Sequence, residues 1–364
     1  MKIACLGGGQ LGLMLAAAGV RLGVEFAFVE ADTKAPASRL GTLIDPRQHV
    51  ALEACLADPD VAAITCERED IPQDLLDILE GRLQPAPEVL RVARDRLREK
   101  ELFSTLGIPC APYQAVTGLQ DLEQAAEHLG LPMVLKTRCG GYDGKGQFII
   151  REPGELAAAW QAMAPQHCVA EAFIPFSCEL SLIGVRSTTG EMAFYPLTRN
   201  VHHQGILRLS LAPHVDAPME RQAQEWVERL LRHWQLVGTL AVEFFVCQGQ
   251  LLANEMAPRP HNSGHWTMVG CQSSQFDNHL RAILGWPLGD TAALGPAAMV
   301  NFIGAAPEAR QLAAWPGGWL YGKAPRPGRK LGHLSLCAAD AAQRTALLQE
   351  LAPWPGIWLP SELQ

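Results

Sequence analysis

The chain has 364 residues, 48% of them hydrophobic, and a formal net charge of −8 at pH 7. The length predicts roughly two to three domains, and the apolar content is ample for several buried cores. The acidic balance argues against nucleic acid as a partner, because a phosphate backbone is bound by an excess of Lys and Arg. No apolar run reaches the roughly 20 residues that span a bilayer, so we expect no membrane partner.

The ten cysteines are scattered without a C-x-x-C pair, and the first residues read as a strand rather than a signal peptide. Free thiols in a reducing compartment are typical of such a chain. We therefore expect a cytoplasmic protein.

The first segment alternates apolar strands with helices, with strands at 2–6, 25–29 and 61–65 and helices from 10 and at 50–56. This βαβαβ pattern predicts a parallel sheet in an α/β domain. Pro85 and Pro87 close the unit, and a single charged helix over 88–106 is expected to lead into the next one. We place the first boundary near residue 95.

The middle of the chain is expected to be α+β with an antiparallel sheet. Its predicted strands are 133–136, 147–150, 169–173, 180–185, 193–195, 240–246 and 251–255, and its predicted helices are 122–129, 153–163 and 219–234. From about residue 291 the chain is rich in Pro, Gly and Trp, with short strands at 300–303, 320–321 and 333–336 and a helix at 338–351. The predicted domains are 1–95, 96–290 and a small β-rich unit over 291–364.

A glycine-rich stretch, Gly140-Gly141-Tyr142-Asp143-Gly144-Lys145-Gly146-Gln147, follows the strand at 133–136. Glycines let successive backbone N–H groups turn toward one anion. No Ser or Thr follows Lys145 and a second strand comes next, so the stretch is not a P-loop. Two interpretations stay open, a hairpin that covers a phosphate and an ordinary glycine-rich turn.

A second glycine-rich stretch, Gly7-Gly8-Gly9-Gln10-Leu11-Gly12, fits the dinucleotide fingerprint after a strand, with Glu30 or Asp32 about 20 residues on. Alone it suggests NAD. The phosphate of a ribonucleotide, or a tight turn without a ligand, would use the same loop. The acidic segment 66–70 follows the third strand, where crevice residues emerge, although a solvated charge run is the commoner meaning.

Two strands joined by the turn at 248–250 form a predicted hairpin that carries Glu243 and Glu255. Period-2 alternation can aim both carboxylates into one space, with Asn254 beside them. Such a set of hard oxygen ligands suits Mg²⁺, which usually completes its shell with waters and nucleotide phosphates. The alternative is an exposed face, although Glu243 sits in an otherwise apolar strand where an unpaired carboxylate is costly.

Several other charged residues have two interpretations each. Lys136 ends an apolar strand, where it can reach a phosphate or extend to solvent. His261 and His265 have an H-x-x-x-H spacing, but loop histidines are favoured over zinc because glycine and serine between them argue against a helix. The basic segment 323–333 suits an anionic ligand or a solvated turn.

Taken together, these motifs resemble the ATP-grasp superfamily and, within it, the N5-carboxyaminoimidazole ribonucleotide synthases of purine biosynthesis. The resemblance covers nearly the whole chain and rests on GGGQLG, DRLREKELF, KTRCGGYDGKGQ, FYPLTRNVHHQGIL, NEMAPRPHNSGHW and RPGRKLGH. It implies an ATP-grasp fold with a Rossmann-like N-terminal domain and a small C-terminal domain. The acidic segment departs from the usual Y-E-x-E-N, so substrate contacts there are less secure.

The resemblance also implies ligand contacts, with ATP and Mg²⁺ as cofactors. The residues implied to bind ATP are Arg96, Lys136, Gly141, Tyr142, Asp143, Gly144, Lys145, Gly146, Gln147, Glu171, Ala172, Phe173, Ile174, Glu179, His202, Asn254 and Glu255. Magnesium would be held by Glu243 and Glu255. The aminoimidazole ribonucleotide would meet Gln10, Leu11, Tyr142, Asp143, Lys145, Arg259, His261, Asn262, Ser263, Lys323 and Arg329. The residues expected in catalysis are Lys136, Asp143, Arg259 and His261.

The implied reaction joins ATP, bicarbonate and 5-aminoimidazole ribonucleotide to give the N5-carbamate, ADP and phosphate. The family also implies a homodimer. The nearest rival is another ATP-grasp ligase, such as formate-dependent glycinamide ribonucleotide transformylase. An NAD-dependent oxidoreductase would leave Glu243, Glu255 and the second glycine loop without a role. A silent nucleotide-binding regulator fits poorly with the apparently intact set of site residues.

Overall fold

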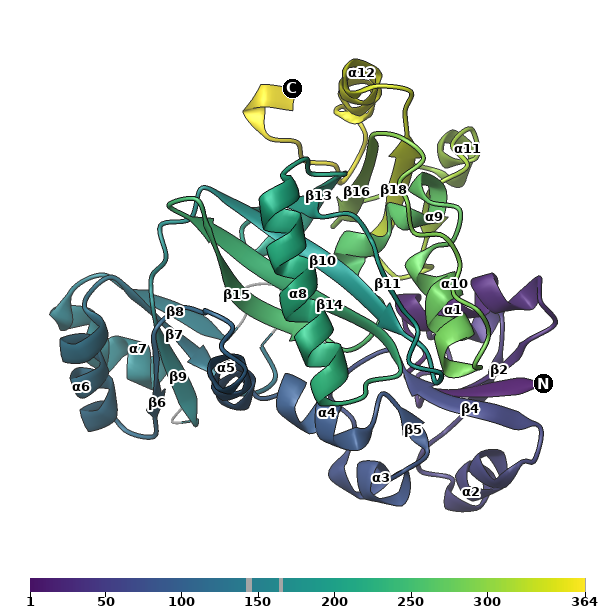
Figure 1. Ribbon diagram of the computed structural model, residues 1–364, viewed down its shortest axis with the longest axis horizontal. Helices are drawn as coiled ribbons and strands as arrows, with labels where there is room; N and C mark the ends of the chain where they lie inside the picture. The colour runs from purple at the N-terminus through teal and green to yellow at the C-terminus, as the bar shows by residue number, and fades with distance from the viewer. Residues whose placement is uncertain (142–145, 164–165, 364) are drawn as a thin grey trace.

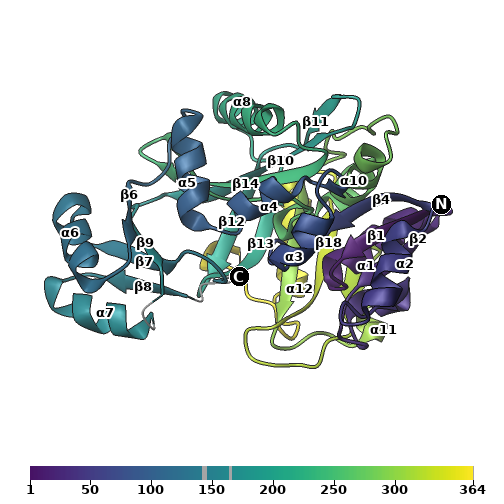
Figure 2. The same ribbon diagram turned by 90° about the horizontal axis from the view of Figure 1, so that it is seen from below.

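In the computed structural model, which describes residues 1–141, 146–163 and 166–363, the strands form three sheets. A parallel sheet holds the N-terminal residues, a small antiparallel sheet forms a separate lobe, and a large sheet runs between them (Figures 1 and 2). None of the helices in the described part of the chain is long and apolar enough to cross a bilayer.

The N-terminal sheet has five strands in the order β3-β2-β1-β4-β5, all parallel, as the βαβαβ pattern predicts. Leu6 at the end of β1 lies opposite Cys66 at the end of β4, so the segments that follow these two strands emerge side by side. The elements are β1 Lys2–Leu6, α1 Gln10–Val20, β2 Glu25–Val29, η1 Pro36–Arg39, β3 Thr42–Ile44, α2 His49–Ala57, β4 Val61–Cys66, α3 Gln73–Ile78 and β5 Leu83–Gln84.

The single helix predicted over 88–106 is wrong, because the chain forms two helices, α4 Pro87–Ala93 and α5 Arg96–Thr105. Asp95 between them has an extended backbone, and its side chain accepts a hydrogen bond from the N–H of Leu97. An aspartate in this position caps the start of a new helix. The many charged residues around it made this helix start hard to recognise from the sequence. The break lets α5 turn toward the small lobe.

The small lobe is a four-stranded antiparallel sheet in the order β6-β9-β7-β8 (Figure 1). Lys136 of β7 lies opposite Gln147 of β8, so the glycine-rich stretch joins two antiparallel strands, as expected. Residues 142–145 of that stretch lie outside the described residues. The elements are β6 Tyr113–Val116, α6 Leu119–Leu129, β7 Met133–Thr137, β8 Gln147–Ile150, η2 Pro153–Glu155, α7 Leu156–Ala162 and β9 Cys168–Ala172.

The large sheet has nine strands, ordered β15-β14-β10-β12-β13-β16-β18-β17 with β11 on β10. The pairing of β13 with β16 makes the C-terminal strands a continuation of the middle region, and α8 covers one face (Figure 1). The elements are β10 Cys178–Arg186, β11 Met192–Phe194, β12 Thr198–His203, β13 Ile206–Ala212, α8 Ala217–His233, β14 Gly238–Cys247, β15 Gln250–Ala257, β16 Ala297–Ile303, β17 Gly318–Leu320 and β18 Lys330–Cys337.

The remaining elements are η3 Asn262–Gly264, α9 Thr267–Gly270, α10 Gln275–Ile283, α11 Ala309–Leu312, α12 Ala341–Leu351 and η4 Ser361–Leu363. Helix α10, which the sequence patterns did not reveal, packs on α1 of the N-terminal domain. Phe276 of α10, Leu13 of α1 and Tyr321 share one buried apolar cluster. Burial of such side chains stabilises the contact between the first domain and the large sheet.

Candidate functional site

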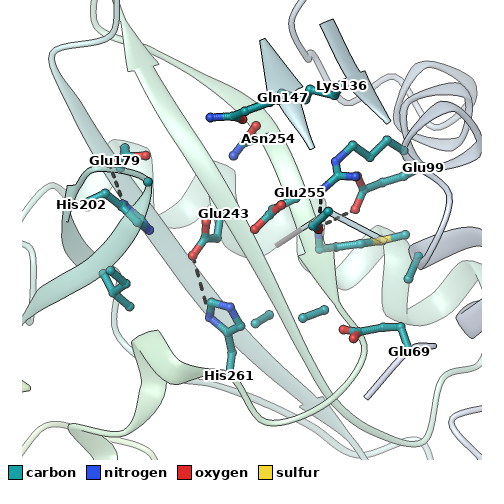
Figure 3. A pocket seen from close by; sticks show the side chains of 18 of the residues that line it. Glu69, Glu99, Lys136, Gln147, Glu179, His202, Glu243, Asn254, Glu255 and His261 are labelled. Atoms are coloured by element: carbon teal, nitrogen blue, oxygen red, sulfur yellow. Dashed lines mark hydrogen bonds and ion pairs between the residues drawn. The ribbon is translucent and has the colours of Figure 1, made fainter. Parts of the chain in front are cut away.

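A cleft of about 870 Å³ is lined by the N-terminal domain, the small lobe and the large sheet (Figure 3). It brings together most of the residues expected in the site, although they are spread over more than 250 positions of the sequence. The expected residues that line it are Gln10, Leu11, Arg96, Lys136, Gly141, Gln147, Glu171, Ala172, Phe173, Ile174, Glu179, His202, Glu243, Asn254, Glu255, Arg259, His261 and Asn262.

A few expected residues are placed elsewhere. Tyr142, Asp143, Gly144 and Lys145 lie outside the described residues, and those that do not line the cleft are Gly146, Ser263, Lys323 and Arg329. Lys323 still lies beside the cleft, because its Nζ donates to Oε1 of Gln10 at 2.5 Å. The guanidinium of Arg329 donates to the carbonyl of Ala324 at 3.1 Å. From the same basic segment, the cleft is lined by Lys330.

The hairpin of β14 and β15 carries the two carboxylates, as predicted. Its two-residue turn has positive φ at Gln248 and Gly249, and Glu243 lies directly opposite Glu255. The register shifts after this pair, and Asn254 is the extra residue. Such a β-bulge re-aims side chains, which explains how Asn254 and Glu255, neighbours that would otherwise point to opposite faces, both line the cleft.

The two facing carboxyl groups make it costly for both to be ionised at once. Burial and the charge of Glu255 raise the pKa of Glu243 to about 8. A cation between them would relieve both effects, and Mg²⁺ is commonly held by one or two carboxylates plus phosphates. The donor set therefore fits that ion. Among the residues that the structure describes, no group of three or more His, Cys, Asp and Glu is arranged to hold a metal by itself.

Lys136 is held by a buried carboxylate. Its Nζ lies 3.0 Å from Oε2 of Glu171, which is also 3.1 Å from Nζ of the buried Lys100. Burial alone would raise the pKa of Glu171, but the two lysines outweigh it and lower that pKa. Sequence reasoning missed Lys100. Its helical spacing from Leu97 and Phe103, both buried, is the signal that could have placed it on the inner face of α5.

Arg96 connects α5 to the base of the glycine-rich stretch. Its guanidinium donates to the carbonyls of Thr137 at 2.8 Å and Gly141 at 2.6 Å. On the large sheet, Nδ1 of His202 lies 2.8 Å from Oε2 of Glu179. Burial would lower the pKa of His202, but this hydrogen bond and nearby carboxylates raise it.

Arg259 follows β15 and reaches the N-terminal domain, where its Nε lies 2.9 Å from Oε1 of Glu69. Residues 67–70 all line the cleft. Glu67 is buried and Glu69 is half-buried beside Arg259, as the crevice interpretation predicts, whereas Arg68 and Asp70 keep exposed side chains, as in a solvated charge run. This ion pair ties the carboxyl end of β4 to the hairpin, a contact between residues 190 positions apart in the sequence.

His261 is fixed through both its backbone and its ring. Its N–H donates to Oε1 of Gln275 at 2.8 Å, and Nε2 of Gln275 donates back to its carbonyl at 2.7 Å. Its Nδ1 lies 2.9 Å from Oγ of Ser263. Burial, with the charges of Arg259 and Lys330, holds the pKa of His261 well below its usual range. The imidazole is therefore neutral near pH 7.

The loop Gly7–Gly12 wraps around a carboxylate of the protein itself. Glu67 accepts hydrogen bonds from the N–H of Gly9 and, at 2.8 Å, from the N–H of Gly12. A Cβ on Gly7 or Gly9 would lie 2.8 or 2.5 Å from the Glu67 side chain, so either substitution would force that side chain to shift, and Gly7 also has a positive φ. These N–H groups are the ones that a pyrophosphate would use. The NAD interpretation therefore loses its anion site.

The comparisons with known proteins agree with this geometry. Residues 1–94 match the ribonucleotide synthetase preATP-grasp domain, 101–276 the ATP-grasp domain and 297–346 the phosphoribosylaminoimidazole carboxylase C-terminal domain. The N5-carboxyaminoimidazole ribonucleotide synthase of Pseudomonas aeruginosa is 46% identical over 96% of this chain and 98% of that protein.

Two solved structures are similar over almost their full length. The N5-carboxyaminoimidazole ribonucleotide synthetase of Thermus thermophilus has a TM-score of 0.91 and 43% identity, covering 98% of this chain and 99% of that one. The N5-carboxyaminoimidazole synthase of Aspergillus clavatus, in complex with ADP and 5-aminoimidazole ribonucleotide, has a TM-score of 0.86 and 29% identity, covering 96% and 97%. The chain belongs to the family of N5-carboxyaminoimidazole ribonucleotide synthases.

Proposed function

We propose that this protein carboxylates 5-aminoimidazole ribonucleotide with bicarbonate and ATP, giving N5-carboxyaminoimidazole ribonucleotide, ADP and phosphate, a step of purine biosynthesis. One observation carries the proposal. A single cleft gathers Lys136, the Glu243/Glu255 pair and the Arg259–Asn262 segment, which are the groups needed for a nucleotide, a cation and a second substrate. The Aspergillus relative binds ADP and 5-aminoimidazole ribonucleotide together.

ATP is proposed to lie between the small lobe and the large sheet. Lys136 would meet its phosphates, while the segment 171–174 and Glu179 would contact adenine and ribose. The Glu171 carboxylate already binds two lysines. We therefore propose that Glu171 contacts the adenine through its backbone groups. Arg96 would contribute to ATP binding indirectly, because it hydrogen-bonds to Gly141 in the glycine-rich stretch.

Magnesium is proposed to be held by Glu243 and Glu255 together with the phosphates of ATP. When bound, it would offset the negative charge that develops as the γ-phosphoryl group is transferred. Asn254 lines the same part of the cleft and would donate or accept a hydrogen bond beside the phosphates. This donor set is what distinguishes the hairpin from an ordinary exposed one.

The ribonucleotide is proposed to lie toward the N-terminal domain, near Gln10, Arg259 and Asn262, with Lys323 and Arg329 close to its phosphate. The amide of Asn262 is fixed by Asn301, which donates to its Oδ1 at 2.7 Å. Tyr142, Asp143 and Lys145, which lie outside the described residues, are proposed to cover this substrate.

The chemistry begins with bicarbonate, a poor electrophile, which attacks the γ-phosphoryl group of ATP to form carboxyphosphate. The amine of the ribonucleotide then attacks the carbonyl carbon of carboxyphosphate and displaces phosphate, or attacks CO₂ after carboxyphosphate has split into CO₂ and phosphate; in both cases the nitrogen loses a proton. Either species is lost quickly in open water, so the site must exclude water until the amine attacks. Arg259 and His261 are proposed to orient bicarbonate, with the neutral His261 acting through a hydrogen bond.

The proposal is tested by measuring ADP release with each combination of acid and amine, and by identifying the product. Release that requires both bicarbonate and 5-aminoimidazole ribonucleotide supports it. Release that requires formate and glycinamide ribonucleotide would replace it with the rival ligase. The cytoplasmic location and the homodimer stay predictions, and sedimentation at several protein concentrations would test the second.

A further inference from the structure

A chain of buried hydroxyl and amide groups runs across the large sheet and ends at His261. Its members are Ser210 on β13, Asn200 on β12, Ser181 on β10 and Ser263 in η3, each no more than 3% exposed. The links measure 2.8 Å from Ser210 to Asn200, 2.9 Å from Asn200 to Ser181, 2.9 Å from Ser181 to Ser263 and 2.9 Å from Ser263 to Nδ1 of His261.

The strand register builds this chain. Asn200 and Ser210 lie directly opposite each other across β12 and β13, and Ser181 lies opposite Glu243 across β10 and β14. The chain therefore occupies the face of the sheet that carries Glu243 into the cleft. Burying four polar side chains is costly unless each is satisfied, and here each hydrogen-bonds to the next.

A backbone group fixes the direction of the chain. The N–H of Ser263 lies 3.3 Å from Nδ1 of His261 and can only donate, so Nδ1 must accept. The Ser263 hydroxyl then also donates to Nδ1, and its oxygen accepts from Ser181, whose oxygen accepts from Asn200. Each of the four side chains therefore donates one hydrogen bond to the next group, always in the same direction. The distance of 3.8 Å from Nδ1 to Oε1 of Glu243 is too long for a competing hydrogen bond.

A neutral imidazole that accepts at Nδ1 carries its proton on Nε2. Among the groups that the structure describes, none hydrogen-bonds to Nε2, and His261 lines the cleft. The ring therefore offers a donor to whatever binds there. Two hydrogen bonds to Gln275 fix the backbone of His261, while the series of buried hydroxyl and amide groups fixes its ring.

We propose that Ser181, Asn200, Ser210 and Ser263 are positioning residues that lock His261 as the Nε2–H tautomer, so that His261 donates a hydrogen bond to an oxygen of the bicarbonate-derived group. The tautomer follows from the hydrogen bonds alone, whereas the identity of the acceptor rests on the proposed function. His261 in this state orients the acceptor and withdraws electron density from it. It does not remove a proton through Nε2.

The tautomer is measured directly on the full chain without substrates. Protein labelled with ¹⁵N at histidine is examined by NMR, and His261→Gln assigns the signals. We expect His261 to show a protonated Nε2 and an unprotonated Nδ1. A protonated Nδ1, or a ring that carries both protons at neutral pH, would overturn the proposal. This result does not depend on which substrates the enzyme uses.

Ser181→Ala interrupts this series of hydrogen bonds two links away from the His261 ring and leaves the ring itself unchanged. We expect kcat to fall about tenfold to a hundredfold, by analogy with the loss of a partner that orients a metal-bound histidine. The KM for ATP should stay within about twofold. The Ser263 hydroxyl loses the donor that orients it, so a minor Nδ1–H population of His261 should appear, although the N–H of Ser263 still favours acceptance at Nδ1. Asn200→Asp, which cannot donate to Ser181, should act in the same direction, whereas Ser263→Thr, which keeps the hydroxyl, should retain most activity.

The matched control is Ser187→Ala, a fully buried serine whose hydroxyl pairs with Thr189 at 2.7 Å and belongs to no part of the chain. It removes the same atoms from the same protein. If Ser181→Ala and Ser187→Ala lose the same activity and the His261 signals do not change, the chain is only structural. If the wild type fails to use bicarbonate while His261 remains the Nε2–H tautomer, the proposed function fails and the positioning role stands.

Discussion

Two carboxylate sites meet in the same cleft and are satisfied in opposite ways. In the N-terminal domain, Glu67 is an internal anion, bound by the N–H groups of Gly9 and Gly12. Burial raises the pKa of Glu67, but these two N–H groups oppose the rise. In the hairpin, Glu243 and Glu255 face each other, and the charge of Glu255 adds to burial in raising the pKa of Glu243. The first site is complete without a ligand, and the second is proposed to be completed by a cation. The position of glycines and acids in the sequence does not reveal this difference, because it depends on which groups the fold brings within hydrogen-bonding distance.

The largest expected effect comes from removing a charge in the hairpin. Glu243→Gln should lower turnover by roughly a thousandfold, because a positioned cation contributes several kcal/mol to charge stabilisation and about 1.4 kcal/mol corresponds to a factor of ten. Stability without metal should not fall, since the variant removes repulsion from Glu255. ADP release and thermal unfolding test both points.

Glu228→Gln is the control, since Glu228 pairs with Arg232 on an exposed face of α8. Surface pairs of this kind contribute little, so activity and stability should both stay near wild type. A Glu243→Gln protein that turns over normally, or that unfolds at a much lower temperature, would contradict the contrast between the two sites.

The next effect concerns Arg259, whose guanidinium joins the two regions through Glu69. Arg259→Ala should leave ATP binding largely intact but lower turnover by about a hundredfold to a thousandfold, the scale for loss of one donor to a developing negative charge. Calorimetry with an ATP analogue and ADP release separate binding from chemistry. Wild-type rates in this variant would show that Arg259 only joins the domains. Arg232→Ala, which removes an exposed arginine, is the control.

Much of the site was predictable because its residues are close in sequence or follow strand periodicity. Alternation along β14 and β15 placed Glu243 and Glu255 in one space, and the short turn at Gln248 and Gly249 fixed their register. Asn254 was expected beside them as the neighbour of Glu255 in the sequence, and its contact with ATP was implied by family resemblance. The bulge that brings it into the cleft is a local insertion in the strand pairing, which periodicity does not reveal.

The parts that sequence reasoning missed depend on contacts between distant segments. Glu67 meets the first glycine loop from 55 positions away, so the loop looked like an empty phosphate site. Lys100 was hidden in a charged segment, and its partner Glu171 lies on another lobe. The continuation of the large sheet through β13 and β16 could not be derived, because several pairings of short apolar strands satisfy the same alternation.

A smaller effect is expected from filling the space that Glu67 occupies. In Gly9→Ala the new Cβ would lie 2.5 Å from Oε1 of Glu67, so the loop must shift, at a cost of about 1–3 kcal/mol in the free energy of unfolding. Denaturant unfolding measures this cost. Gly154→Ala is the control, since no atom lies within 4 Å of its Cβ position. Combining Gly9→Ala with Glu67→Ala should cost less than the sum of the two, because Glu67→Ala removes the side chain that the new Cβ would meet. Strict additivity would contradict the internal-anion role.

The smallest effect is expected from Glu67→Gln, which keeps the shape of the side chain but replaces one accepting oxygen with an NH₂ group. One of the N–H groups of Gly9 and Gly12 then loses its acceptor, and the free energy of unfolding should fall by about 1 kcal/mol. Turnover should fall no more than the loss of folded protein explains, because the Glu67 carboxylate binds the glycine loop and not a substrate. Glu67 also lines the cleft, so the comparison of kcat with unfolding is decisive. A loss of turnover much larger than the loss of stability would mean that Glu67 also binds substrate, and the two carboxylate sites would then differ in degree rather than in kind.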